Sequence, residues 1–399
     1  MHLSKIKEAK ENIKDIINTT PLIYSPIFSS INNCSLYMKC ENLQITGAYK
    51  IRGALNRIRS LTEEEKSKGV VCSSAGNHAQ GVAYAANLLG VKATIVMPKS
   101  TPYLKIQSTQ EYGANVLLYG SCYDDSYHKA KAIENENNSV FIHPFNDINV
   151  IYGQGTIALE IFESLPDVDI IICPIGGGGL ISGVALAIKE LNPNVKIIGV
   201  QAEGANAMEK SYKLGEIQSL FTVNTIADGI AVKSPGEVTF NIIKDYVDDI
   251  ITISDKEIAE AFLILCEKHK LLAEASGAAS LAALKKLNVN NKKVVSIISG
   301  GNIDMVTISS LISDGLVERG RLFCFSVELP DTPGQLQQIS TILSEVNANV
   351  IQLEHNQFKA TNRLKNVLLE VTIETNGRDH IEIIKDKLLK NGFKITEIY

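Results

Sequence analysis

Lys50 is the residue of this sequence best suited to covalent chemistry. It lies within residues 46–54 (TGAYKIRGA), whose apolar and small side chains can exclude water from an amine and leave room for a flat ligand. A lysine amine in such surroundings has a lowered pKa and becomes a nucleophile. Taken alone, the segment also fits a solvated helix start, in which the lysine stem covers apolar surface.

A run of four glycines, Gly176–Gly179, separates the apolar segment 169–173 from the apolar segment 180–188. Glycines between a strand and a helix let several backbone N–H groups converge on an anion. We therefore expect this run to bind a phosphate group. It fits neither G-x-G-x-x-G nor G-x-x-x-x-G-K, and the alternative is a flexible turn.

Two further segments place polar groups where an apolar strand ends. Residues 73–81 (SSAGNHAQG) carry hydroxyl and amide groups that can bind a carboxylate or a phenolic oxygen, although helix capping also explains them. A Ser/His nucleophile is not favoured because G-x-S-x-G is absent, and His78 fits better as a packed helix residue. Ser299 follows the apolar segment 293–298, so it can bond a neutral ring nitrogen at the ligand-binding edge of a parallel sheet, or simply cap the strand.

Short apolar runs alternate with helical patterns through most of the chain. Such alternation predicts a parallel sheet covered by helices on both faces, in the α/β class. The predicted strands are 69–72, 93–96, 114–118, 168–173, 195–202 and 293–298, and the predicted helices are 77–89, 102–112, 148–164, 180–188, 255–270, 275–284 and 304–318.

After residues 319–321 the pattern changes to strand, helix, strand, strand, helix, strand. The predicted elements are 322–329, 333–346, 348–356, 365–374, 378–390 and 392–398. This βαββαβ order is ferredoxin-like and long enough for a domain of its own. We therefore expect one domain over residues 1–320 and a second over 321–399.

Composition favours a cytoplasmic globular protein whose partners are small molecules or other subunits. The 399 residues are 45% hydrophobic and 21% charged, with a formal net charge of −5, which gives no field for attracting nucleic acid. The N-terminal residues carry charges every few positions, and no apolar window is long enough for a membrane span. Seven cysteines without a CxxC pair suggest neither disulfides nor a zinc site.

Taken together, the four polar segments resemble the fold-type II pyridoxal-phosphate enzymes, and specifically the threonine dehydratases, over about residues 15–320. The resemblance implies two α/β subdomains with parallel-rich open sheets, the smaller one roughly at residues 50–150. It also implies that Lys50 binds pyridoxal 5'-phosphate covalently. The other implied cofactor contacts are Asn77 with the ring oxygen, Gly176, Gly177, Gly178, Gly179 and Leu180 with the phosphate, Glu274 against the ring, and Ser299 with the ring nitrogen. The implied substrate-carboxylate contacts are Ser74, Ala75, Gly76, Asn77 and His78.

The reaction implied by the resemblance is deamination of L-threonine, and also of L-serine, by elimination of water to a 2-oxo acid and ammonia. Lys50 takes the Cα proton, the cofactor phosphate protonates the leaving hydroxide, and a neutral Ser299 favours elimination over transamination. Serine racemases carry a serine where this chain has Ala75, so racemisation should be weak. The chain departs from the dehydratase pattern at Ala48-Tyr49, where Ser-Phe is usual, which leaves the local polarity of the pocket open.

Other functions remain as alternatives. A serine dehydratase or serine racemase would share the fold. A non-catalytic amino-acid-binding regulatory protein would leave Lys50 and the glycine run unexplained, and a nicotinamide dehydrogenase is disfavoured by the missing G-x-G-x-x-G.

Two weaker patterns suggest a cation and an effector. Glu203, Ala207 and Glu209 match a segment that binds a monovalent or divalent cation in relatives, although a solvated helix start explains them equally. Residues 321–399 resemble an ACT domain, which implies an amino-acid effector such as isoleucine near Asp331, Gly334 and Asn349, or a dimerisation module without a ligand. We expect a homodimer or homotetramer.

Overall fold

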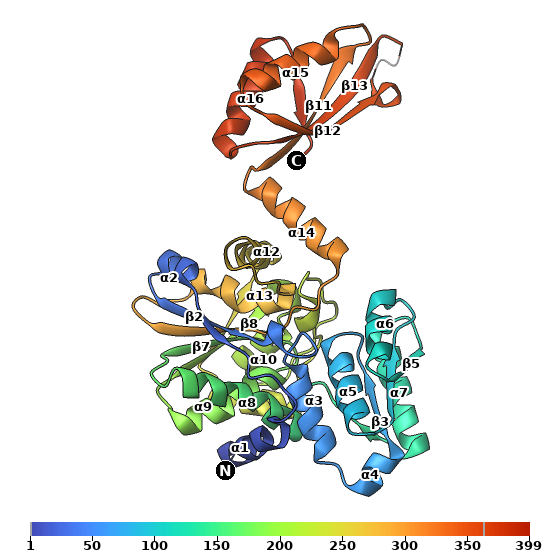
Figure 1. Cartoon of the computed structure of the whole chain (residues 1–399), viewed down its shortest axis with the longest axis vertical. Coiled ribbons are helices and arrows are strands. Elements are labelled where there is room, and N and C mark those ends of the chain that lie inside the picture. The colour runs from blue at the N-terminus through green and yellow to red at the C-terminus, as the bar shows by residue number, and fades with distance from the viewer. Residues whose placement is uncertain (1, 362–363) are drawn as a thin grey trace. The chain divides into compact units, whose positions relative to one another are not determined.

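The computed structural model describes residues 2–361 and 364–399 (Figure 1). It divides into two compact units, Met1–Asp304 and Met305–Tyr399. The sequence predicts the boundary at residues 319–321, whereas the observed division precedes helix α14 (Met305–Glu318) because this helix contacts the first strand of the second unit. Within the described residues, no helix has the length and apolar character needed to span a membrane.

The larger body of the first unit is built on a six-stranded sheet of order β1-β2-β10-β7-β8-β9. All neighbours are parallel except β1 and β2. The strands are β1 (Leu22–Tyr24), β2 (Ser35–Cys40), β7 (Ile170–Pro174), β8 (Lys196–Ala202), β9 (Asp249–Ile253) and β10 (Lys293–Ile298). Every residue of β7 is buried, as expected for a central strand covered on both faces.

Helices cover both faces of this sheet, with α8 and α9 on one face and α12 and α13 on the other (Figure 1). The helices of this body are α1 (His2–Ile13), α2 (Pro26–Asn32), α8 (Ile148–Ser164), α9 (Gly179–Leu191), α10 (Ala207–Leu214), α11 (Glu237–Tyr246), α12 (Asp255–Ile264) and α13 (Ala275–Ala282). The single helix predicted at 255–270 is wrong in its last turn: α12 ends at Ile264, and a π turn, Leu265–His269, follows before Lys270 adopts a left-handed φ of 56°.

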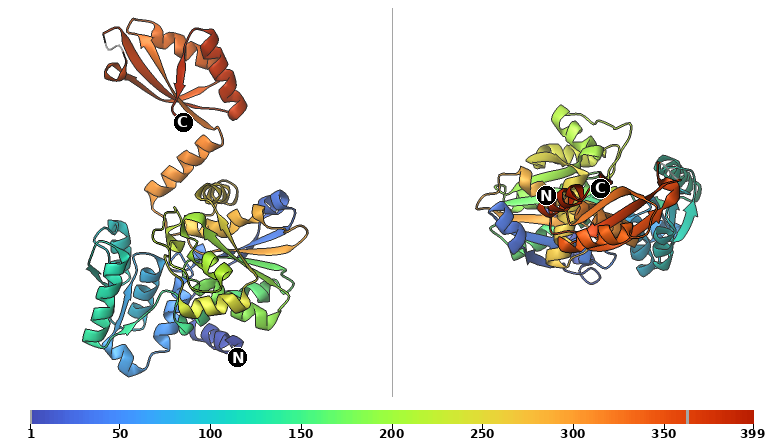
Figure 2. Two further views of the ribbon diagram at one scale, coloured as in Figure 1. Left: turned by 180° about the vertical axis from the view of Figure 1, so that it is seen from behind. Right: turned by 90° about the horizontal axis from the view of Figure 1, so that it is seen from above.

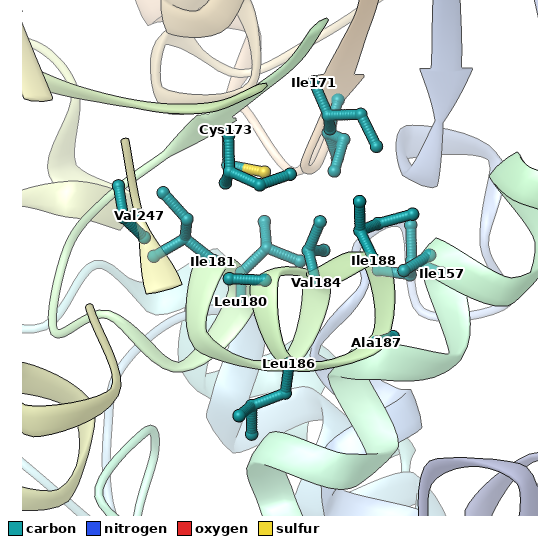
Figure 3. Packing of buried hydrophobic residues seen from close by; sticks show 14 of the residues in the cluster. Ile157, Ile171, Cys173, Leu180, Ile181, Val184, Leu186, Ala187, Ile188 and Val247 are labelled. Atoms are coloured by element: carbon teal, nitrogen blue, oxygen red, sulfur yellow. The ribbon is translucent and has the colours of Figure 1, made fainter. Parts of the chain in front are cut away.

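The core beneath the glycine run packs α9 against β7. Ile181, Val184 and Ile188 recur at helical spacing and lie against Ile171 and Cys173 of the strand, all at 0% exposure (Figure 3). This packing fixes where α9 begins and therefore where the glycine run lies.

The smaller body stands beside the large sheet and is built on an all-parallel sheet of order β5-β4-β3-β6 (Figures 1 and 2). Its elements are β3 (Val70–Ser73), β4 (Ala93–Met97), β5 (Asn115–Leu118), β6 (Val140–Phe141), α4 (Glu63–Lys68), α5 (Asn77–Leu88), α6 (Tyr103–Glu111) and α7 (Tyr123–Asn137). Helix α3 (Lys50–Arg59) contacts α5 of the smaller body and α8 of the larger one. It therefore joins the two bodies.

The second unit has the βαββαβ order predicted from the sequence. Its elements after α14 are β11 (Leu322–Pro330), α15 (Gln335–Glu345), β12 (Asn349–Asn356), β13 (Asn366–Glu374), α16 (Arg378–Lys390) and β14 (Ile395–Glu397). They form an antiparallel sheet of order β12-β13-β11-β14. Alternate residues of β11 and β13 pack with α15 and α16 in one apolar core, so both helices cover one face.

A buried ion network anchors α3. The Arg52 guanidinium donates to Glu41 at 2.8 Å from both Nε and Nη2, and to Glu160 at 2.6 Å from Nη1. Lys39 also donates to Glu160, and none of the four side chains exceeds 4% exposure. Burial opposes ionisation of Glu160 and is the largest single influence, yet the charges and hydrogen bonds of Arg52 and Lys39 together outweigh it and hold the pKa of this carboxyl below its usual value. The network is neutral as a whole, which makes burying four charges tolerable.

Arg52→Met is expected to destabilise the first unit because it leaves Glu41 without a counter-charge in the core. Removing one partner of a buried ion pair costs about 3–5 kcal/mol of unfolding free energy. Urea denaturation followed by circular dichroism would measure the loss. Lys68→Met is the matched control, since it removes a surface partner of Glu64 whose side chain is 79% exposed and should leave the transition unchanged. Equal transitions for the two variants would contradict the anchoring role.

Candidate active site

A short main-chain pairing brings Lys50 and Ser299 together. The N–H of Tyr49 donates to the carbonyl of Ser299 at 3.1 Å, and the N–H of Gly301 donates to the carbonyl of Gly47 at 2.8 Å. Between these bonds, Ala48 and Gly300 form an isolated antiparallel bridge. The loop before α3 therefore pairs with the chain that leaves β10, although the two segments are about 250 residues apart in sequence.

The amine of Lys50 lies in a partly buried polar niche. Its Nζ donates to the carbonyl of Pro144 at 2.8 Å and lies 5.3 Å from the centre of the Tyr49 ring. Burial lowers the pKa of Lys50 to about 8, while the charge of Glu274 acts in the opposite direction. At pH 7 this amine is still mostly protonated, but its unprotonated fraction is far larger than that of an ordinary lysine.

Asn77 and Glu274 form the polar wall near this amine. Asn77, the first residue of α5, donates from Nδ2 to both carboxylate oxygens of Glu274, at 2.8 and 3.0 Å. Glu274 caps α13 and also accepts from the hydroxyl of Ser276 at 2.8 Å. Burial raises the pKa of Glu274 to about 7, with a further contribution from the charge of Asp228, although the bonds from Asn77 and Ser276 favour ionisation.

The glycine run leaves no room for side chains. A Cβ on Gly177 would lie 2.3 Å from the ring of Phe145, and one on Gly179 would lie 3.0 Å from the Cα of the same residue. Gly178 has a φ of 97° and precedes the first turn of α9. In the described part of the chain, the N–H groups of Gly176, Gly177 and Gly178 have no hydrogen-bond acceptor. They remain available to an anion at the start of the helix.

Other predicted site residues take structural positions that the sequence did not specify. Ser299 is 3% exposed, and its hydroxyl donates to the carbonyl of Ser276 at 3.5 Å. Ser74 accepts the N–H of Gly76 through its hydroxyl at 3.3 Å. Leu180 is 2% exposed, and its side chain belongs to the core under α9 (Figure 3), so only its backbone could reach a ligand.

Sequence reasoning missed the segment 142–145, which contacts both Lys50 and the glycine run. His143 accepts the N–H groups of Phe145 and Asn146 through Nδ1, at 3.3 and 2.8 Å. Burial, followed by the charge of Lys50, lowers the pKa of His143 to about 4, so its ring is neutral. The segment directly follows β6, and a polar group at a strand end is the signal that also indicated Ser299.

His78 is packed as the sequence suggests. It is 3% exposed, and its Nε2 lies 2.9 Å from the carbonyl of Ile142. Burial lowers its pKa to about 3, and the charge of Lys50 acts in the same direction. Its Nδ1 is buried without a partner in the described residues. A ring this resistant to protonation is poorly suited to act as a base.

The predicted cation ligands face lysines. Glu209 is 8% exposed and pairs with Lys213, while Glu203 is exposed and lies 3.7 Å from Lys286. Ala207 begins α10 and is buried. Over the described residues there is no group of three or more His, Cys, Asp or Glu side chains arranged to hold a metal ion. The cation remains a prediction.

The predicted effector residues are exposed at the start of α15 and β12. Asp331 accepts from Gln357 Nε2 at 2.7 Å, Gly334 has a φ of 94° and precedes the first turn of α15, and Asn349 opens β12. The turn offers backbone donors, but no contact among the described residues identifies a ligand.

Comparison with known proteins gives consistent matches. Residues 13–300 match the family described as "Pyridoxal-phosphate dependent enzyme". The L-threonine ammonia-lyase of Thermotoga maritima is 46% identical over 394 residues, covering 98% of each chain. The processed form of threonine deaminase isoform 2 from Solanum lycopersicum has a TM-score of 0.76 and 36% identity, over 78% of this chain and 86% of that one. Maize serine racemase has a TM-score of 0.75 and 38% identity, over 80% of this chain and 98% of that one.

Because its pKa is lowered, Lys50 is predicted to react with acylating reagents at a lower pH than an ordinary lysine. Only the neutral amine reacts, so modification of Lys50 should reach half its limiting rate at about pH 8, compared with about 10.4 for a lysine peptide. Trace acetylation of protein freed of cofactor, across pH and read by mass spectrometry of the Lys50 peptide, measures this. In Glu274→Gln protein the midpoint should fall, because the negative charge that stabilises the ammonium is gone. A wild-type midpoint near 10 would show that the amine is solvated.

Proposed function

The chain belongs to the family of pyridoxal-phosphate-dependent enzymes, and from that premise we propose that it deaminates L-threonine to 2-oxobutanoate and ammonia. The observation that carries the proposal is a Lys50 amine whose pKa is lowered to about 8 and which lies close to the Asn77–Glu274 pair. The L-threonine ammonia-lyase of Thermotoga maritima, aligned over nearly the full length of both chains, supports this choice of substrate.

The residues present fit pyridoxal phosphate. A phosphate needs donors without side-chain obstruction, and the unpaired N–H groups of Gly176–Gly178 at the start of α9 meet both needs. An aldehyde needs an unprotonated amine, which Lys50 supplies. A phenolic ring oxygen needs a donor, and Asn77 Nδ2, which donates to Glu274 here, has two N–H groups and could give one of them to that oxygen. When bound, the cofactor withdraws electrons from the Cα of an attached amino acid and so acidifies its Cα–H.

Lys50 and Ser299 have different roles in the proposed reaction. Lys50 accepts the Cα proton, since burial keeps its amine a competent base near neutral pH. The neutral hydroxyl of Ser299, buried at the end of β10, cannot hold a positive charge on a ring nitrogen as a carboxylate would. With the cofactor bound, electron density at Cα would be delocalised less into the ring, which would favour loss of the β-hydroxyl over transamination.

Ala75 separates elimination from racemisation. Racemisation needs a second proton-transfer group on the opposite face of Cα, and a methyl group cannot serve. The likeness in fold to maize serine racemase therefore does not by itself imply racemisation by this chain. L-Serine should still be deaminated, because a pocket for threonine discriminates only modestly against the loss of one methyl group.

Regulation by an amino acid through residues 321–399 completes the proposal. The βαββαβ unit is the architecture expected of an ACT domain, and the Thermotoga relative aligns across 98% of this chain. The proposed effector is isoleucine, bound near Asp331, Gly334 and Asn349. Control further requires that the effector bind two states of the protein unequally.

Threonine turnover tests the proposed reaction. Wild-type protein with pyridoxal phosphate should release 2-oxobutanoate and ammonia in equal amounts from L-threonine, and D-serine should form from L-serine much more slowly than ammonia. Lys50→Ala should lower the rate by at least about 10³-fold and abolish the visible absorption band of bound cofactor. Lys68→Ala, at an exposed surface pair, should change neither. A colourless wild-type protein, or D-serine as the main product, would refute the assignment.

Isoleucine inhibition tests the proposed regulation. At subsaturating L-threonine, isoleucine should raise the substrate concentration for half-maximal rate by about 5-fold or more, in the range of ordinary allosteric coupling. Asp331→Ala and Asn349→Ala should reduce this shift without changing the rate in its absence. Glu382→Ala, at an exposed position of α16, is the control. If isoleucine has no effect on the wild-type protein, the second unit does not supply feedback control by this effector.

A further inference from the structure

Asn302 links several groups near Lys50 through one amide nitrogen. Its Nδ2 donates to three acceptors, the carbonyl of Thr46 at 2.7 Å, Oδ1 of Asn77 at 2.8 Å and Oε1 of Gln80 at 3.1 Å. An amide nitrogen carries two hydrogens, so one of them is shared. Asn302 thus links the loop before α3 to the first turn of α5.

These contacts determine which way the Asn77 amide faces. Its Oδ1 accepts from Asn302, and its Nδ2 therefore points at the two oxygens of Glu274. Rotating the amide by 180° would set Nδ2 against Nδ2 of Asn302 and Oδ1 against the carboxylate. Both contacts would be repulsive, so the pair selects one orientation.

The Asn302 amide is itself held in place by the Lys50 loop. Gly47 has a φ of +69°, and a Cβ there would lie 2.2 Å from Oδ1 of Asn302. The opposite end of the amide donates to the carbonyl of Thr46. Asn302 is therefore fixed by main-chain atoms next to Lys50, and any shift of that loop would be passed on to Asn77.

We propose that Asn302 is a positioning residue that orients the Asn77 amide so that its N–H groups face the bound cofactor. This inference rests on the proposed function, in which Asn77 donates to the ring oxygen. Asn302 needs no contact with the cofactor, since it acts through the oxygen end of Asn77. Cofactor affinity should then depend on a donor at position 302 and not only on a side chain that fills the space.

Asn302→Asp is the informative change because it keeps the shape and replaces the donor by an acceptor. The Asn77 amide would turn its Nδ2 toward the introduced carboxylate and present Oδ1 to Glu274 and the ring. Asn56→Asp is the matched control. Asn56 is also buried, at 4% exposure, and its Nδ2 donates to the carbonyl of Asn149 at 2.8 Å on the far side of α3.

The experiment titrates full-length protein, freed of cofactor, with pyridoxal phosphate, and follows visible absorption and quenching of tyrosine fluorescence. Asn302→Asp should weaken binding about 10-fold or more, as expected when a donor to a charged acceptor is lost. It should also change how the absorption maximum depends on pH, because the ring oxygen loses its partner. Asn56→Asp should keep the dissociation constant within about 2-fold of wild type, whatever its effect on the melting temperature.

Asn302→Ala keeps the inference testable if Asn302→Asp does not fold, because it removes the donor without adding a charge and should weaken binding in the same direction. Equal affinities for the position-302 variants and Asn56→Asp would overturn the positioning role while leaving the proposed function intact. A wild-type protein that fails to bind pyridoxal phosphate would overturn both.

Discussion

The buried ion network of Arg52, Glu41, Glu160 and Lys39 is the constraint on which the site depends. Arg52 lies two residues after Lys50 in α3, and its guanidinium is held by carboxylates from the end of β2 and from α8. Charges this deeply buried are tolerated only in close pairing, so α3 cannot slide or rotate without leaving one of them alone. The start of α3, and with it the amine of Lys50, is therefore fixed by this ion network and does not need a bound ligand to hold it.

Much of the fold was predictable because the patterns are local. The βαββαβ order of the second unit and strands β7, β8 and β10 of the central sheet follow from apolar runs and helical spacing, whereas β1 and β9 were not predicted. Strand β2 was not predicted, since Lys39 interrupts its apolar run and only the distant Glu160 makes its burial acceptable. The π turn after α12 also has no signal in the spacing of apolar residues.

Candidate site residues could be named from the sequence, whereas their contacts could not. Lys50, Asn77 and Ser299 each follow from a strand-end or glycine-rich segment, and the structure brings them near one another. Pro144 and Asn302 were missed because their contacts join segments far apart in the chain. Local spacing shows that a polar group is at a strand end, whereas its hydrogen-bond partner depends on which ends meet after folding.

Four helices begin at the residues that surround Lys50: α3 at Lys50 itself, α5 at Asn77, α9 at Gly179 and α13 at Ala275. The N-terminal end of a helix carries a partial positive charge of about half an elementary unit. Several such ends together create a region of positive potential in a protein whose formal net charge is −5. The same field that attracts a phosphate and a carboxylate also disfavours a proton on the lysine amine. Anion capture thus draws mainly on the backbone, and most side-chain substitutions would leave it in place, whereas the lowered pKa of Lys50 comes first from burial.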